Sequence, residues 1–129
     1  MTPKDLRYSE THEWVRVTGK TARIGISDFA QKQLGDIVYV ELPAVGTKVE
    51  AGKTIGVVES VKTVSDVMSP VSGKVVGHNE RLGGDPALVN QDCYGEGWIF
   101  EVELVGPDEV KELLDAAAYD KHCETAAHH

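Results

Sequence analysis

A single lysine lies between two strand-like runs in the stretch Val57-Val58-Glu59-Ser60-Val61-Lys62-Thr63-Val64-Ser65-Asp66-Val67. Residues 54–60 and 63–69 are rich in β-branched side chains, which favour strands, and neither Gly, Pro nor Asn lies between the two runs. We therefore expect a stiff β-hairpin with the primary amine of Lys62 at its tip. An enzyme could modify such an amine, and an attached group would swing on a rigid base. The alternative is an ordinary solvated lysine.

The segment before this stretch predicts a first hairpin followed by a short helix. Residues 13–17 and 21–26 alternate apolar and polar side chains around the turn Thr18-Gly19-Lys20, which is typical of paired strands. Ser27 is a suitable N-cap for a helix over residues 28–34. Gly35 then ends that helix, and a strand follows over residues 36–42 as far as Pro43.

The segment after this stretch predicts two more strands. Residues 73–77 and 98–104 carry strand-like apolar side chains, and residues 79–92 form a polar connector between them. The small apolar patch at residues 87–89 is consistent with one helical turn.

A C-terminal helix is expected to follow the last strand. Pro107 fits the first helical position, and Asp108 and Glu109 would face the positive end of the helix dipole. Apolar side chains then recur at helical spacing and close about Lys121: Val110, Leu113, Leu114, Ala117 and Ala118. The tail 122–129 is expected to be flexible.

These elements predict a mainly β fold. Many short strands separated by turn signals indicate a β sandwich or flattened barrel of antiparallel sheets, with a short helix after the first hairpin and a packed amphipathic C-terminal helix. The length of 129 residues predicts one domain over residues 1–129, with a core of about residues 6–121.

Composition excludes several classes of partner. A net charge of −8 would repel a phosphate backbone, so nucleic-acid binding is not expected, whereas partners with basic docking patches are favoured. No apolar run approaches the roughly 20 residues that span a bilayer. The N-terminus has no signal-peptide or transit-peptide pattern, and Cys93 and Cys123 make no disulfide framework. We expect a bacterial cytoplasmic protein, with a mature mitochondrial matrix form as the alternative.

The lysine stretch resembles the lipoyl-attachment site of the glycine cleavage H-protein family. The similarity lies in residues 59–62, in Ser65-Asp66 and in residues 69–75. Other pieces similar to this family occur in the same order along the chain, at residues 12–15, 25–31, 34–43, 88–90 and 94–98. The resemblance extends from about Leu6 to Tyr119, and it implies a hybrid barrel-sandwich fold related to lipoyl and biotinyl domains.

The resemblance implies a carrier rather than an enzyme. Lipoate would be attached covalently to Lys62, with Glu59, Ser60 and Val61 as the context that a lipoyl ligase or an octanoyl/lipoyl transferase recognises. The carrier would take the aminomethyl group of glycine from glycine decarboxylase, a pyridoxal-phosphate enzyme, to aminomethyltransferase, which uses tetrahydrofolate. Dihydrolipoamide dehydrogenase, a flavoenzyme with FAD, would re-oxidise it. A monomer is expected.

In this family the loaded arm folds into a cleft, and the positions carried over to this chain are Thr11, Glu13 and Asp66. The two carboxylates could pair with a protonated amine, although both could also be ordinary solvated acids. Some relatives have a histidine in the helix after the first hairpin, where this chain has Gln33, so a titrating imidazole at that place is in doubt.

Two alternatives to this function stay open, and a third is disfavoured. A biotinyl domain is disfavoured, because biotin-acceptor lysines typically lie between methionines, whereas Lys62 lies between Val61 and Thr63. An H-like protein that donates lipoyl groups to other proteins would share the fold and the lysine. An unmodified β-sandwich interaction module would lack the lipoyl group.

Other reactive side chains are interpreted as structural. His12 is expected to be a hydrogen-bonded neighbour of Trp14, and Cys93 has no catalytic arrangement around it. The tail residues match no standard metal-site spacing, so no metal is expected: His122, Cys123, His128 and His129.

Overall fold

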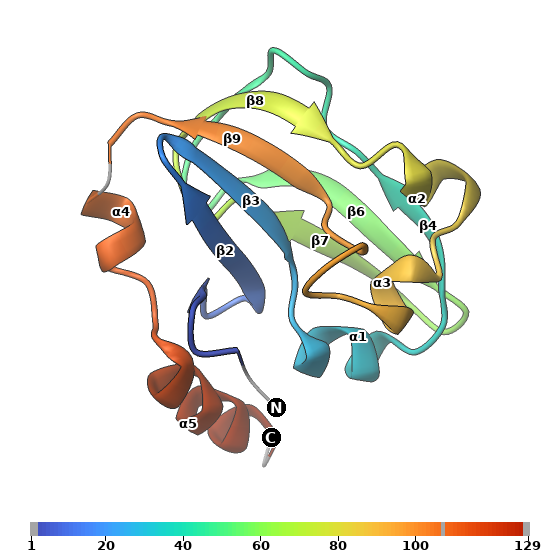
Figure 1. Cartoon of the computed structure of the whole chain (residues 1–129). Helices are drawn as coiled ribbons and strands as arrows, with labels where there is room; N and C mark the ends of the chain where they lie inside the picture. The colour runs from blue at the N-terminus through green and yellow to red at the C-terminus, as the bar shows by residue number, and fades with distance from the viewer. Residues whose placement is uncertain (1–2, 107, 128–129) are drawn as a thin grey trace.

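Two antiparallel sheets face each other in the computed structural model, which describes residues 3–106 and 108–127 (Figure 1). The six-stranded sheet has the order β1 (Arg7–Tyr8), β2 (Glu13–Thr18), β3 (Thr21–Ile26), β9 (Phe100–Leu104), β8 (Gly73–His78) and β5 (Lys48–Val49). The three-stranded sheet has the order β4 (Ile37–Glu41), β6 (Thr54–Ser60) and β7 (Val64–Met68). The predicted mainly β class is confirmed.

The main core lies between the two sheets. Alternation places every second side chain of a strand on the inner face, so Val15, Ile24 and Val102 of the large sheet meet Val58 and Val67 of the small sheet. All five are at most 1% exposed. Each buried side chain of this size contributes about 1.5–3 kcal/mol, so this interior fixes how the sheet carrying Lys62 lies on the other.

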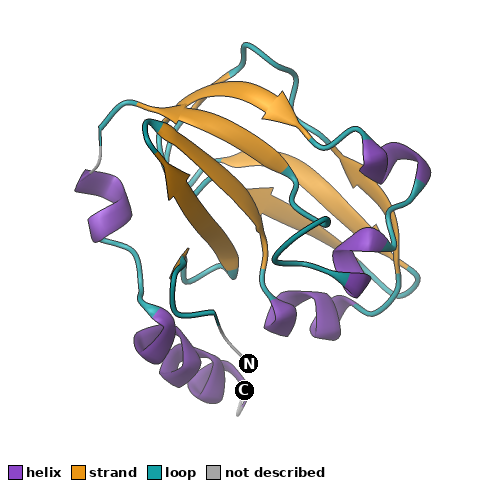
Figure 2. Cartoon of the chain, in the orientation of Figure 1, coloured by secondary structure: helices purple, strands orange, loops and turns teal. Residues whose placement is uncertain are grey.

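The short helices lie around the strands rather than between the sheets (Figure 2). They are α1 (Asp28–Leu34), α2 (Arg81–Gly84), α3 (Leu88–Gln91), α4 (Asp108–Lys111) and α5 (Ala116–Ala127). Helix α1 has the predicted bounds: the Ser27 hydroxyl accepts from the Ala30 N–H, and Gly35 follows with a φ of 79°. Helix α2 was not expected, because its Gly83-Gly84 pair reads as a turn in the sequence.

The C-terminal helix is present, but its predicted bounds are wrong. The chain forms two helices, because the backbone of Leu114 pairs with that of Tyr8 in two hydrogen bonds of 2.8 Å between them. Asp115 then caps α5 by accepting from the Ala118 N–H at 2.8 Å. Ala117 and Ala118 are exposed, and Pro107 lies outside the described residues.

Helix α5 covers a second apolar cluster beside β1 (Figure 1). Its members are Leu6, Tyr8, Trp14, Ala116 and Tyr119. The rings of Tyr8 and Tyr119 stack at 4.5 Å between centroids. The helix includes residues 122–127 of the tail that was expected to be flexible, whereas residues 128–129 lie outside the described part of the chain.

Strand β4 forms one edge of the small sheet, and its pairing with β6 shifts register between Ile37 and Tyr39. Because of this shift, the consecutive side chains of Val38 and Tyr39 both face outward, and each is 52% exposed. An extra residue of this kind bends a strand and interrupts its ladder.

Candidate functional site

Lys62 lies in the turn of the β6–β7 hairpin, as predicted. The Ser60 N–H donates to the Thr63 carbonyl at 2.8 Å. The Ser60 hydroxyl oxygen accepts from the N–H groups of Lys62, at 3.3 Å, and Thr63, at 3.1 Å. Val61, Lys62 and Thr63 are exposed. The turn is therefore pinned by one side chain, which explains why it needs no Gly, Pro or Asn.

The turn is also tied to the loop after α1. The Val61 N–H donates to the Asp36 carbonyl at 3.0 Å. That loop is held by Asn90 of α3, whose side-chain oxygen accepts from the Ile37 N–H at 2.9 Å. The Asn90 amide nitrogen donates to the Gly35 carbonyl at 2.8 Å. The lysine therefore projects from a fixed mount rather than from a mobile loop.

An open surface depression of about 600 Å³ lies beside Lys62. Its walls include Thr11 and His12 from the turn before β2, and Ala30 and Gln33 from α1. Gly35 lies under the lysine stem: a Cβ at Gly35 would meet Lys62 Cε at 3.4 Å. A group attached to Lys62 thus has an adjacent recess in which to lie.

The predicted cleft residues Thr11, Glu13 and Asp66 occupy three different environments. Thr11 is exposed and lines the depression. Glu13 is 2% exposed, and its carboxylate accepts hydrogen bonds from the Thr11 hydroxyl, from the Ser9 hydroxyl at 2.7 Å and from the Met68 N–H at 3.3 Å. Glu13 therefore reaches the depression only through Thr11.

Asp66 is exposed on the outer face of β7, opposite Val57 in the sheet. Glu59 lies on the same outer face, between Tyr39 and Val64 in the sheet. The pairing of Glu13 and Asp66 with an amine stays a prediction, since the two carboxylates do not line the depression together in this structure.

The burial of Glu13 predicts a pH dependence of stability. Burial raises the pKa of its carboxyl, although the hydrogen bonds from Thr11 and Ser9 oppose part of this shift. Below the unfolded-state pKa both states are protonated, and the native state keeps its full stability. As pH rises, the unfolded chain loses its proton first, so stability falls until the pH passes the folded-state pKa.

A Glu13→Gln variant, which does not titrate at this position, is the comparison. The free energy of unfolding of the wild type minus that of the variant should decrease as the pH rises above about 4, the usual pKa of a glutamate. Urea unfolding at each pH measures it. A difference that stays constant or increases over this range would contradict a raised pKa at Glu13.

The other reactive groups have structural partners. The Cys93 carbonyl accepts from the Trp14 indole N–H at 2.8 Å, and burial raises the pKa of the Cys93 thiol to about 12, so the thiolate needed for nucleophilic chemistry does not form near neutral pH. His12 Nδ1 lies 2.7 Å from the Tyr119 hydroxyl rather than bonding Trp14.

The described residues form neither a metal site nor a membrane-spanning helix. Among them, no three His, Cys, Asp or Glu side chains are grouped closely enough to hold a metal ion; the His128 and His129 side chains lie outside that set. No helix in the same part of the chain has both the length and the apolar character needed to cross a membrane.

The sequence reasoning missed two residues of this site. In the sequence, Asn90 is marked only by its place in a family-like piece, and nothing marks Tyr119 as a site residue. Asn90 lies 53 residues from Ile37 in the chain, and Tyr119 lies 107 residues from His12. No local pattern signals contacts over such separations.

Comparisons with known proteins agree with this geometry. The family model described as glycine cleavage H-protein matches residues 6–126. The glycine cleavage system H protein of Symbiobacterium thermophilum is 58% identical over 118 residues, which is 92% of each chain. That of Marinobacter nauticus is 54% identical over 121 residues, 93% of each chain.

A solved structure shows the same fold. The crystal structure of a glycine cleavage system H protein from Mycobacterium marinum matches with a TM-score of 0.84 and 38% identity, covering 97% of this chain and 98% of that one. The agreement of the family model, of the relatives over nearly their whole lengths and of this fold leads to one conclusion: the chain belongs to the glycine cleavage H-protein family.

Proposed function

We propose that this chain is the lipoyl-bearing carrier of the glycine cleavage system and that Lys62 holds the lipoyl group. Proteins of this family carry lipoate on a lysine. The observation that supports Lys62 is its exposed place in a turn pinned by Ser60, next to an open depression of about 600 Å³. An amide to lipoate needs a reachable primary amine, and the carrier needs a rigid base for the arm.

The lipoyl group, when bound, supplies a disulfide ring that takes up the aminomethyl group of glycine and can be re-oxidised afterwards. The protein's own residues present and shelter this group. Ser60 fixes the direction in which the lysine leaves the turn, and Thr11 offers a hydroxyl at the wall of the depression. No bond-making step is assigned to this chain, whose role is that of a non-catalytic carrier.

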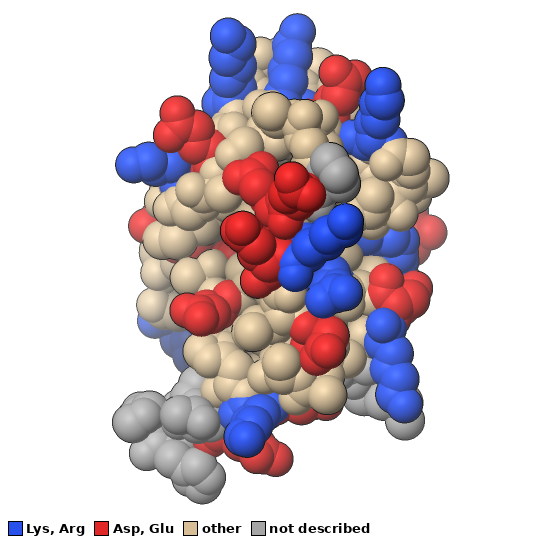
Figure 3. All heavy atoms as spheres, turned by 90° about the vertical axis from the view of Figure 1, so that its left-hand side faces the viewer, with Lys and Arg blue, Asp and Glu red and all other residues tan. Residues whose placement is uncertain are grey.

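The partners are the enzymes between which such a carrier moves. They are glycine decarboxylase with pyridoxal phosphate, aminomethyltransferase with tetrahydrofolate, dihydrolipoamide dehydrogenase with FAD, and a lipoyl ligase or octanoyl/lipoyl transferase. The net charge of −8 supports docking on basic patches. On the face shown in Figure 3, acidic side chains gather near the centre. Helix α4 carries two acidic residues, Asp108 and Glu109, in its first turn.

We also propose a bacterial cytoplasmic location, which the bacterial origin of both named relatives supports. A mitochondrial matrix form is the alternative.

Two measurements test the proposed function. The intact mass of protein produced in cells that can lipoylate should show one lipoyl group. A reconstituted glycine cleavage reaction should then depend on adding this protein. Unmodified protein would favour an interaction module. Lipoylated protein that supports no glycine cleavage, but passes its lipoyl group to other acceptors, would favour a lipoyl relay.

The hydrogen bonds of Ser60 predict that turn geometry affects lipoylation. Ser60→Ala removes the acceptor shared by the N–H groups of Lys62 and Thr63. Losing these bonds should make the ordered conformation of the turn less stable by about 1 kcal/mol. Lipoylation should therefore slow several-fold. The initial rate with a lipoate ligase, followed by intact mass, measures this.

Ser65→Ala is the matched control, because its hydroxyl donates to the Asp66 carbonyl at 3.4 Å within β7, outside the turn. Equal rates for both variants would mean that the hydrogen bonds of Ser60 do not limit the reaction with the ligase.

A further inference from the structure

His12 has an unusual backbone conformation at the wall of the depression beside Lys62. Its φ is 74°, in the left-handed region that a non-glycine residue rarely adopts. Two backbone hydrogen bonds hold this turn: the His12 N–H donates to the Ser9 carbonyl at 3.1 Å, and the Ser27 N–H donates to the His12 carbonyl at 2.9 Å. Conformations of this kind cluster at binding sites.

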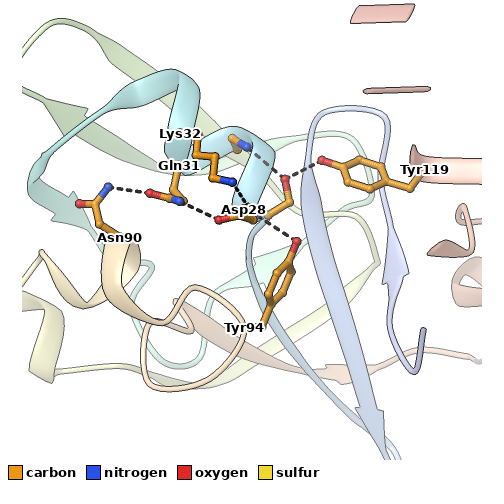
Figure 4. Close-up of polar contacts among 8 residues, drawn as sticks. Asp28, Gln31, Lys32, Asn90, Tyr94 and Tyr119 are labelled. Carbon is orange, nitrogen blue, oxygen red and sulfur yellow. Dashed lines mark hydrogen bonds and ion pairs between the residues drawn. The ribbon is translucent and has the colours of Figure 1, made fainter. Parts of the chain in front are cut away.

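A buried tyrosine on α5 joins this turn to α1. Tyr119 is 1% exposed, and its hydroxyl lies 2.7 Å from His12 Nδ1 and 2.5 Å from the Ser27 hydroxyl oxygen. That oxygen also accepts from the Ala30 N–H at 3.2 Å, so the hydroxyl of Tyr119 contacts the N-cap of α1 (Figure 4). His12 and Ala30 both line the depression. The Tyr119 hydroxyl of the C-terminal helix therefore connects two walls of the depression.

We propose that the His12 imidazole binds the amine of the loaded arm in this depression, and that Tyr119 is the positioning residue that holds the imidazole in the required tautomer. This inference rests on the proposed attachment of the arm at Lys62. It assigns the arm a contact that lies in the depression itself, unlike the carboxylates of Glu13 and Asp66.

The distances at the Tyr119 hydroxyl allow two placements of the protons, and the proposal requires the one in which Tyr119 donates to Ser27. The Ser27 oxygen has two lone pairs, and it can accept from both the Ala30 N–H and the Tyr119 hydroxyl. In that placement, Tyr119 accepts from His12 Nδ1–H. The neutral ring is left with an unprotonated Nε2, which can accept a hydrogen bond from an ammonium group.

The surroundings of the ring favour its neutral form. Burial lowers the pKa of His12, and His122 of α5 lowers it further. The His122 ring lies 5.5 Å away between centroids, and Phe29 of α1 packs on His12 at 4.7 Å. Lys62 shares the depression with His12 and adds positive charge there until its amine is acylated. A ring that is neutral near pH 7 can accept a hydrogen bond from an ammonium group, whereas a protonated ring would repel that group.

Tyr119→Phe tests the positioning role, and Tyr8→Phe is its matched control. Both tyrosines are buried in one stacked pair, and each change removes one hydroxyl. The Tyr8 hydroxyl donates to the Pro3 carbonyl at 2.5 Å and does not contact His12. A merely structural role of the pair would affect both variants alike.

The first readout needs no lipoyl group. Ring ¹⁵N chemical shifts of unlipoylated protein should show the Nδ1–H tautomer of His12 in the wild type and in Tyr8→Phe. They should show the Nε2–H tautomer in Tyr119→Phe, because the hydrogen bond that selects the tautomer is gone. An Nε2–H tautomer in the wild type would overturn the proposal.

The second readout is the lifetime of the aminomethyl-loaded protein. It should fall about fivefold in Tyr119→Phe, the change that one hydrogen bond typically makes, and stay near the wild-type value in Tyr8→Phe. His12→Gly removes the imidazole but suits the left-handed φ, so it should fold and show the same short lifetime. Wild-type lifetimes in Tyr119→Phe and His12→Gly would overturn the proposal. A wild type without lipoyl mass would instead refute the proposed function, and the tautomer result would still stand.

Discussion

Lys62→Arg protein will fold normally and carry no lipoyl mass. Arginine keeps the positive charge, but its guanidinium cannot form the amide to lipoate that a primary amine forms. Lys62 is exposed in a turn whose hydrogen bonds come from the backbone and from Ser60, so the free energy of unfolding should change by less than about 0.5 kcal/mol. Intact mass and urea unfolding measure the two effects. We expect the glycine cleavage reaction that depends on this protein to stop.

Lys53→Arg is the matched control. Lys53 is an exposed lysine that directly precedes β6, at the opposite end of the same hairpin. This variant should be lipoylated at the wild-type rate. Lipoyl mass retained in Lys62→Arg protein would show that another lysine is used, and it would contradict the site.

Gly73→Ala will strongly destabilise the fold. A Cβ at Gly73 would lie 2.0 Å from the Glu103 carbonyl oxygen and 2.6 Å from Val102 Cγ1. Both neighbours belong to β9, which pairs with β8 in the middle of the large sheet. Backbone must therefore move, and we expect a loss of about 3 kcal/mol or more in the free energy of unfolding.

Gly83→Ala provides the comparison for this change. Apart from its two chain neighbours and the backbone of its own helix, no heavy atom lies within 4 Å of a Cβ built at Gly83, and its φ is not in the left-handed region. Because alanine favours a helix over glycine by up to about 1 kcal/mol, this variant should be as stable as the wild type or slightly more stable. If both variants lost a similar amount of unfolding free energy, the close approach of β8 and β9 would not be the cause of the destabilisation.

Local signals in the sequence were sufficient for most of the strands and for α1. The Lys62 hairpin and the cap of α1 follow from side chains within a few residues of each other, such as Ser27 with Ala30 and Ser60 with Thr63. The C-terminal segment failed because a distant contact overrides its helical spacing. The pairing of Leu114 with Tyr8 ends one helix and allows Asp115 to begin another.

At the candidate site, too, local features could be predicted and distant contacts could not. Lys62 could be chosen from its own neighbours in the chain. The environment of Glu13 could not, because alternation predicts only which face a side chain takes and not what covers that face. Glu13, Trp14 and Val15 are nevertheless all buried. Val15 lies in the main core, Trp14 packs in the cluster that α5 covers, and the Ser9 and Thr11 hydroxyls donate to the Glu13 carboxylate.

The register shift in β4 has a consequence for self-association. An edge strand with unpaired backbone groups can add a strand from another copy, and a run of Ile, Val and Tyr such as residues 37–40 is well suited to that pairing. The shift between Ile37 and Tyr39 breaks the regular spacing of those groups, so an incoming strand could pair on only one side of it. The shift thereby hinders aggregation through this edge. It lies close to the turn in which the Val61 N–H donates to the Asp36 carbonyl.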